Sequence, residues 1–206
     1  MKKNTFQILA EVIAFCSLGF LVGCGGPSRI DAPEFDAAAI AAEAMSMYDS
    51  DSDGQLDEEE LKSCMALGNA IAEIDTDGDG RISEAEVQAR VEFFLSTRSG
   101  RQSLACRVLK SKRPLRGATV TFVPEPFMGD TIQAASGVTD PTGLATINIE
   151  DELGGVQTGF YKVEISRPSS SGKETLSAKY NSETILGQEV TTGSVQLAEG
   201  LVIEIR

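Results

Sequence analysis

Histidine is absent from this sequence of 206 residues. Because the ordinary pKa of histidine lies close to neutral pH, this side chain is the commonest general base, and it is also a frequent zinc ligand. Its absence excludes Ser-His-Asp triads and the zinc sites of most hydrolases. We therefore expect a protein that is not an enzyme.

Basic side chains are scarce in one part of the chain. Residues Asp31 to Thr97 contain 18 acidic and 3 basic side chains, whereas Arg98 to Arg206 contain 12 of each. The net charge of −13 therefore comes mainly from one acidic module, which is joined to a neutral one. An acidic module repels phosphate backbones and attracts cations, so we expect no nucleic-acid partner and a cationic ligand.

One stretch of the neutral module, Arg98 to Arg116, contains seven lysines or arginines and no acid. Such a stretch is usually a solvated basic edge, and we favour this interpretation. The alternatives are docking onto the acidic module or onto anionic lipid.

Long hydrophobic runs are missing near the N-terminus. The uncharged apolar run from Val12 to Val22 has eleven residues, which is too short for an ordinary membrane-spanning helix. Because it follows Lys2 and Lys3, it is typical of a secretory signal peptide. The run ends in "LVGC", Leu21 to Cys24, which resembles the lipobox of bacterial lipoproteins.

This resemblance implies cleavage before Cys24, the residue that would carry the lipid. Residues 1–23 would be the signal peptide and residues 24–34 a tether, which places the protein in the cell envelope, anchored to a membrane by its N-terminal lipid. Gly25 and Gly26 stand where signals for inner-membrane retention have aspartate, which favours the outer membrane in a Gram-negative cell. An uncleaved hydrophobic anchor is the alternative.

Cysteines are few, and two of the four lie in the N-terminal segment. The other two are Cys64 and Cys106. In an exported protein a disulfide between them could join the two modules. Because Cys64 falls at an apolar position of a predicted helix, we favour a buried thiol.

Two stretches of the acidic module are near copies of each other: "DSDSDGQLDEEE", Asp49 to Glu60, and "DTDGDGRISEAE", Asp75 to Glu86. Each resembles an EF-hand loop, which binds calcium through positions 1, 3, 5, 7, 9 and 12 and has glycine at position 6. The predicted ligands of the first loop are Asp49, Asp51, Asp53, the carbonyl of Gln55, Asp57 and Glu60. Those of the second loop are Asp75, Asp77, Asp79, the carbonyl of Arg81, Ser83 and Glu86.

These oxygen donors fit calcium, which prefers six to eight oxygen ligands. Without a cation, the carboxylates crowded into each loop would repel one another. Leu56 and Ile82, both at position 8, are expected to meet across a short ribbon. We therefore predict two bound calcium ions, one in each loop.

Apolar residues at helical spacing flank both loops. Met45 and Tyr48 share one helix face before the first loop, and Val87 and Val91 share one after the second. The fourteen residues between the loops leave room only for short helices. We predict an EF-hand pair over residues 35–97, similar to the compact pairs of bacterial proteins.

The methionines of the acidic module could indicate a calcium sensor. Sensor EF-hands open a methionine-rich groove when calcium binds, whereas others scarcely move. In so small a domain we interpret Met45, Met47 and Met65 as core residues. Extracellular modules bind calcium with dissociation constants of about 10⁻⁴ to 10⁻³ M, and calcium is plentiful outside the cytoplasm. A permanently filled structural site is therefore favoured, with a calcium-gated peptide-binding or protein-binding module as the alternative.

After a polar linker at residues 98–103, short β-rich runs follow one another. Seven runs bounded by Gly, Pro or Asp predict strands: "LACRVL", "ATVTFVP", "TIQAASGVT", "LATINI", "FYKVEIS", "QEVTT" and "GLVIEI". They indicate a seven-stranded antiparallel β-sandwich over residues 104–206. The predicted fold class is therefore α+β, with a small all-α EF-hand pair followed by this sandwich.

Four segments of the second module, "PLRGATVTFVPE", "GVTDPTGLATI", "GFYKVEISRP" and "SAKYN", resemble the carboxypeptidase regulatory-like (transthyretin-like) domains of bacterial surface lipoproteins. Such domains have no active site, so the resemblance implies a structural or interaction role with a surface protein as a candidate partner. Tyr161 and Tyr180 are expected to pack in the sandwich and to anchor a loop. A non-catalytic subunit of a surface hydrolase is the alternative.

Overall fold

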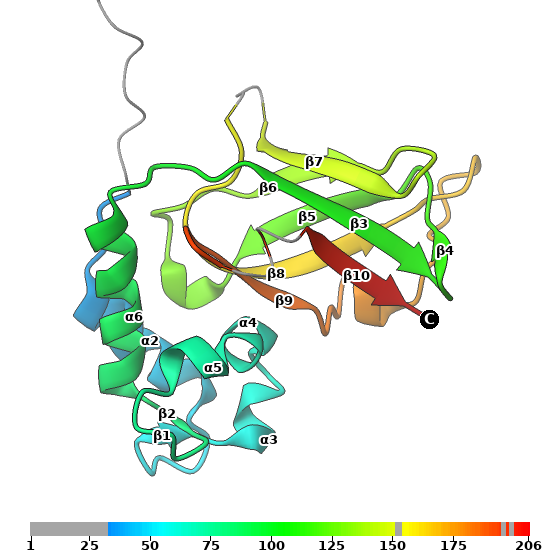
Figure 1. The fold of residues 1–206 in the computed structure, drawn as a ribbon. Coiled ribbons are helices and arrows are strands. Elements are labelled where there is room, and N and C mark those ends of the chain that lie inside the picture. The colour runs from blue at the N-terminus through cyan, green and yellow to red at the C-terminus, as the bar shows by residue number, and fades with distance from the viewer. Residues whose placement is uncertain (1–32, 151–153, 195–196, 198–199) are drawn as a thin grey trace, which may run out of the picture.

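The computed structural model describes residues 33–150, 154–194, 197 and 200–206. Helices form the first part of this range and a curled sheet the second, and the helices lie beside the sheet (Figure 1). The predicted signal peptide, Cys24 and most of the predicted tether lie outside the described residues. Within the described range no helix has the length and apolar character needed to cross a membrane.

The helical part contains two long helices separated by short elements. Asp36 begins the first of them by accepting the amide of Ala39 at 3.0 Å. Three short helices follow Asp57 of the first loop, and the first of these helices begins within that loop. In chain order the elements are α2 (Ala37–Tyr48), β1 (Gln55–Leu56), α3 (Glu58–Leu61), α4 (Met65–Asn69), α5 (Ile71–Ile74), β2 (Ile82–Ser83) and α6 (Glu84–Thr97).

A short antiparallel ribbon, with two residues from each strand, joins the two acidic loops. β1 pairs with β2 in antiparallel fashion, and Leu56 stands opposite Ile82. Both side chains are fully buried. The predicted meeting of these two residues is therefore confirmed, and it holds the loops side by side.

The second part is built from short strands joined by turns. Each of the seven predicted runs forms a strand, and a further short strand pairs with the first of them. The strands are β3 (Leu104–Lys110), β4 (Arg113–Pro114), β5 (Thr119–Pro124), β6 (Ala135–Val138), β7 (Leu144–Ile149), β8 (Gly159–Ser166), β9 (Gly187–Val190) and β10 (Leu201–Ile205). Two 3-10 turns, η1 (Pro126–Met128) and η2 (Ala178–Tyr180), lie between them.

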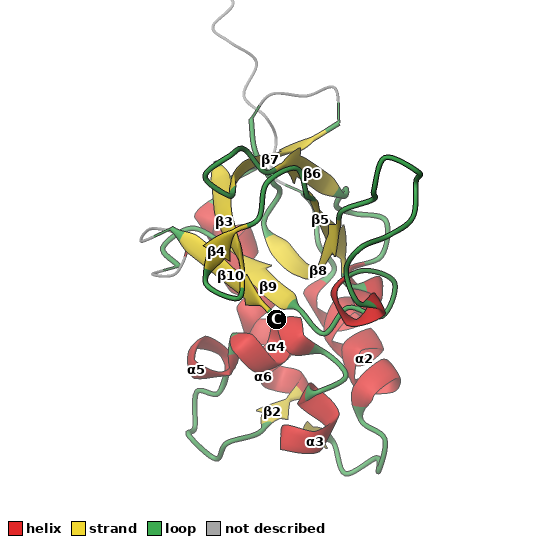
Figure 2. Ribbon diagram, turned by 90° about the vertical axis from the view of Figure 1, so that its right-hand side faces the viewer, coloured by secondary structure: helices red, strands yellow, loops and turns green. Residues whose placement is uncertain are grey.

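The strands follow one path in the order β10-β3-β7-β6-β5-β8-β9. The sheet curls around its core, as the view in Figure 2 shows. The described strand pairs are antiparallel except β3 with β10, which is parallel. The α+β arrangement is therefore confirmed, and one parallel pair stands where the sequence predicts only antiparallel ones.

The helices and the sheet share one core. Buried apolar residues of both parts form a single cluster. The ring of Phe94 in α6 lies 5.3 Å from that of Phe160 in β8, which in turn lies 5.8 Å from Phe127 in η1. At Gly187 of β9 an added Cβ would lie 2.2 Å from the amide nitrogen of Ala66 in α4. The close contact between α4 and β9 therefore requires glycine at this position.

Cys64 and Cys106 are both free and buried. Cys64 is the residue before α4, and Cys106 lies in β3. Burial raises the pKa of each thiol to about 12. The structure therefore has the buried thiols that we favour and no disulfide between these two residues.

The two tyrosines of the sheet part have structural roles. The hydroxyl of Tyr161, a fully buried residue of β8, donates to the carbonyl of Gln157 at 2.8 Å. The hydroxyl of Tyr180 donates to the carbonyl of Arg206 at 3.2 Å and accepts its amide at 3.0 Å. Tyr161 packs in the core and Tyr180 anchors the segment around η2, as expected.

Candidate metal centre

The first acidic loop gathers three carboxylates at one point. One oxygen each of Asp49, Asp51 and Asp53 lies within 4.8 Å of the others. Backbone amides hold these side chains inward, since the amide of Asp53 donates to Asp49 at 3.2 Å and to Asp51 at 3.1 Å. The amide of Gly54 donates to Asp49 at 3.0 Å, and its φ of 87° makes the sharp turn that glycine permits.

The second loop repeats this arrangement. The amides of Gly78 and Gly80 donate to Asp75 at 2.7 and 2.9 Å, and the amide of Asp79 donates to Asp77 at 3.1 Å. Carboxylate oxygens of Asp75, Asp77 and Glu86 lie within 4.8 Å of one another. The same backbone path is therefore formed twice by two different sequences.

The glutamates at position 12 also begin helices. Glu60 accepts the amide of Asp57 at 3.0 Å while the side chain of Asp57 accepts the amide of Glu60, which is a capping box at the start of α3. Ser83 and Glu86 form the same box at the start of α6. Residues 9 and 12 of each loop are thus fixed relative to each other by the helix that follows.

Hydrogen bonds keep both glutamates ionised. Amides of Asp57 and Ser50 lower the pKa of Glu60 below its ordinary range. At Glu86 burial acts to raise the pKa, but hydrogen bonds from Ser83 and Thr76 outweigh it, so that this pKa is also lowered. Both carboxylates are therefore available as anionic ligands at neutral pH.

Position 7 of the second loop adds a contact that the sequence pattern does not indicate. The guanidinium of Arg81 pairs with Asp53 of the first loop at 2.9 Å, and Nη1 also reaches the amide oxygen of Gln55 at 3.4 Å. Arg81 was predicted as a ligand only through its carbonyl, so this side chain is free to bridge the loops. Because both partners are about half exposed, the pair adds little stability.

The donors suit a hard cation. Those of the predicted ligand set are oxygens only, mostly carboxylates, with no sulfur and no imidazole nitrogen. The amides described above bind oxygens of the aspartates, and carboxylate oxygens of three residues in each loop lie within 4.8 Å of one another. The residues present therefore fit calcium.

Comparison with known proteins agrees with this geometry. A family model described as EF hand matches residues 40–65 and 69–91, one match over each loop. No curated protein and no solved structure matches the chain. The EF-hand matches and the clustered carboxylates together support calcium binding by the helical part.

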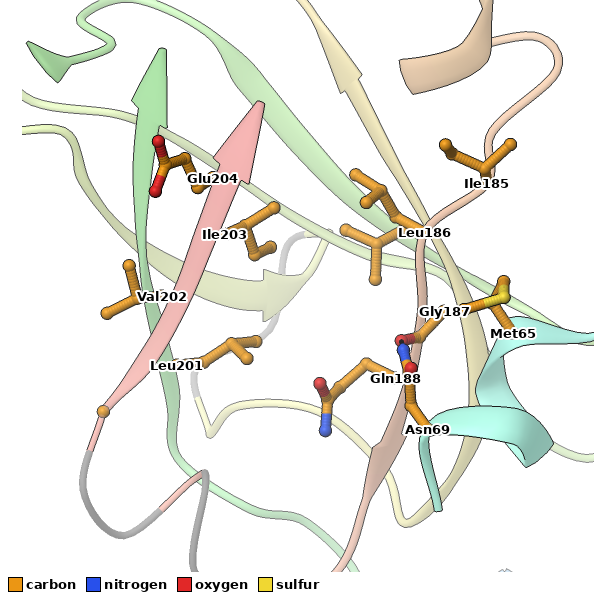
Figure 3. A pocket seen from close by; sticks show the side chains of 12 residues that line it. Met65, Asn69, Ile185, Leu186, Gly187, Gln188, Leu201, Val202, Ile203 and Glu204 are labelled. Atoms are coloured by element: carbon orange, nitrogen blue, oxygen red, sulfur yellow. Dashed lines mark hydrogen bonds between the residues drawn. The ribbon is translucent and has the colours of Figure 1, made fainter. Parts of the chain in front are cut away.

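A separate cavity of about 580 Å³ lies where the two edge strands of the sheet and α4 meet (Figure 3). Leu186, Leu201 and Ile203 form apolar walls, and Asn69 of α4 donates to the carbonyl of Gly187 at 2.8 Å. Among the described lining residues Glu204 is the one ionisable side chain. The described lining residues thus include no pair of ionisable groups for acid-base chemistry.

Proposed function

We propose that each acidic loop binds one calcium ion and that the filled loops act as structural sites. The observation that carries this proposal is the repeated binding of the aspartates at positions 1 and 3 by the amide of position 5, with three carboxylates of each loop within 4.8 Å of one another and an ionised glutamate at position 12. A bound cation would neutralise the repulsion among these carboxylates and fix the helices on either side.

Packing favours a structural role over a switch. A sensor must expose an apolar face when calcium binds. Here α4 lies against β9, and Phe94 of α6 lies against Phe160 of β8. Because the sheet already covers these helix faces, opening the pair would also require separating it from the sheet.

Isothermal titration calorimetry on the full-length protein tests the calcium sites. We expect two sites, one lost in Glu60→Gln, the other lost in Glu86→Gln, and both lost in the double variant. Glu59→Gln is the matched control, since Glu59 is an exposed acid next to Glu60 and outside the predicted ligand set. Calcium binding that is unchanged in the double variant would refute the assignment.

We also propose that the protein is non-catalytic, exported and anchored by lipid on Cys24, in the outer membrane if the cell is Gram-negative. Support comes from the two lysines, the short apolar run and "LVGC" at the N-terminus. The resemblance of the sheet part to carboxypeptidase regulatory-like domains supports a role in interaction with a surface protein.

Palmitate labelling in a bacterial host tests the anchor. Labelling is expected to disappear in Cys24→Ser and to persist in Cys16→Ser, because Cys16 would be removed with the signal peptide. Label that remains on Cys24→Ser would show that this cysteine is not the acceptor.

A further inference from the structure

A carboxylate of the sheet part binds the residue that leads into the first EF-hand loop. Glu125, which follows β5 and precedes η1, is 1% exposed. Its Oε2 accepts the hydroxyl of Tyr48 at 3.1 Å and lies 3.7 Å from Nζ of Lys162. A hydroxyl and an ammonium group therefore converge on one buried acid.

The position of Tyr48 in the chain is informative. Tyr48 immediately precedes Asp49, the first predicted ligand of the first loop. The residue that enters the first hand is thus held by a group that belongs to the other part of the molecule.

Glu125 is itself held rigidly. Its amide donates to the carbonyl of Phe160 in β8 at 2.9 Å, and its carbonyl accepts the amide of Met128 at 2.9 Å. The ring of Tyr48 packs edge-on against Phe127 with centroids 6.1 Å apart. Burial raises the pKa of Glu125, whereas Lys162, Tyr48 and Cys64 act to lower it. Loss of any of these donors would leave a buried acid poorly satisfied.

The second hand has a different attachment. Ile74 occupies there the position that Tyr48 has in the first hand, and it has no hydroxyl. Asn69 of α4, before the second loop, donates to the carbonyl of Gly187 at 2.8 Å, and Arg90, after that loop, pairs with Glu189 of β9 at 2.6 Å. The second hand is therefore tied to the sheet on both sides of its loop, through groups other than Glu125.

We propose that Glu125 is a positioning residue for the first calcium loop. By holding Tyr48 it fixes the entry to the loop, so that the first loop binds calcium more tightly than it would without the sheet. This inference rests on the proposed calcium binding. Because coupling between two equilibria is reciprocal, calcium in the first loop strengthens the docking of the helices on the sheet by the same factor.

Tyr48→Phe tests this directly, because it removes one hydroxyl and keeps the ring that packs on Phe127. Calorimetry in a Glu86→Gln background reports the first loop, and a Glu60→Gln background reports the second. We expect Tyr48→Phe to raise the calcium dissociation constant of the first loop about tenfold or more, the size of one lost hydrogen bond to a charged group. The second loop should change less than about twofold.

Three further variants separate positioning from general loss of stability. Tyr161→Phe also removes a buried tyrosine hydroxyl, but one that bonds within the sheet part, so neither loop should weaken. Glu125→Leu is expected to weaken the first loop as Tyr48→Phe does. Glu125→Gln keeps an acceptor for both donors and should retain most of the affinity.

The outcomes distinguish the two proposals. If the first loop takes up no calcium even with Tyr48 and Glu125 intact, the calcium assignment itself fails. If that loop binds calcium and both Tyr48→Phe and Glu125→Leu bind it equally well, the positioning role is refuted. Equal weakening of both loops would also overturn it. Should Glu125→Leu fail to fold, Tyr48→Phe alone decides the question.

Discussion

Removing calcium from the full-length protein is expected to unfold the helical part and to lower the melting temperature by roughly 10–20 °C. A ligand at a hundredfold excess over its dissociation constant stabilises the folded state by about 2.7 kcal/mol per site. Two filled sites would therefore contribute roughly 5 kcal/mol. Folded domains typically have only about 5–15 kcal/mol in total, so this loss is severe.

The structure explains why the effect should spread beyond the loops. Without calcium the clustered aspartates repel one another, and the ribbon between Leu56 and Ile82 transmits the disturbance from one loop to the other. The helices also contribute Phe94 to the core that they share with the sheet. The sheet should therefore melt at a lower temperature as well.

Circular dichroism of the helical signal during heating, in excess calcium and in chelator, measures this effect. The Glu60→Gln, Glu86→Gln double variant is the control and should melt at one temperature in both solutions. Identical melting curves for the unaltered protein would contradict a structural role. Binding of an apolar dye at saturating calcium would instead favour the calcium-gated alternative.

The acidic loops could be predicted from sequence because their geometry is local. The amides that bind Asp49 and Asp75 come from residues three to five positions further along the chain. A twelve-residue pattern therefore contains nearly all the groups that shape each loop. The meeting of Leu56 with Ile82 follows from the same pattern, because EF-hand loops pair at position 8.

The strands were predictable, but one of their pairings was not. Each strand is a short run of β-forming residues, which the sequence displays directly. The parallel pairing of β3 with β10 joins the first and last of the predicted runs, and parallel neighbours require a long crossover. No local signal specifies which distant strand will become the neighbour.

The junction between helices and sheet could not be predicted for the same reason. Tyr48 and Glu125 are 77 positions apart, and Arg90 and Glu189 are 99 positions apart. From sequence alone Arg90 is a charged interruption in the apolar face of a helix. Its role becomes visible only when β9 is placed beside α6.

Arg90→Met is expected to destabilise the protein by about 3 kcal/mol at neutral pH, because it leaves a buried charge without its partner. The guanidinium holds Glu189 through two hydrogen bonds, at 2.6 and 2.9 Å. The side chain of Glu189 is 6% exposed and that of Arg90 is 14% exposed. Methionine can fill much of the space of the arginine stem but cannot satisfy the carboxylate.

The stability lost in Arg90→Met should become smaller as the pH falls. Burial raises the pKa of Glu189 above its ordinary value of 4.5, the charge of Glu73 adds to this, and Arg90 opposes it. Without Arg90 the folded-state pKa rises further, so the charged form is penalised at any pH above it. As the pH falls through that raised pKa toward 4.5, the folded carboxyl binds a proton and the penalty disappears. The deficit relative to the unaltered protein should therefore shrink on acidification.

Urea denaturation of both proteins in excess calcium, from neutral pH down to about pH 5, measures this deficit. The double variant Arg90→Met, Glu189→Leu removes both charges and should recover most of the lost stability, because an apolar pair can replace a buried ion pair at little cost. A deficit that stays constant with pH, or a double variant as unstable as Arg90→Met, would mean that lost packing and not an unpaired carboxylate causes the effect. The junction would then depend on the shape of the Arg90 side chain more than on its charge.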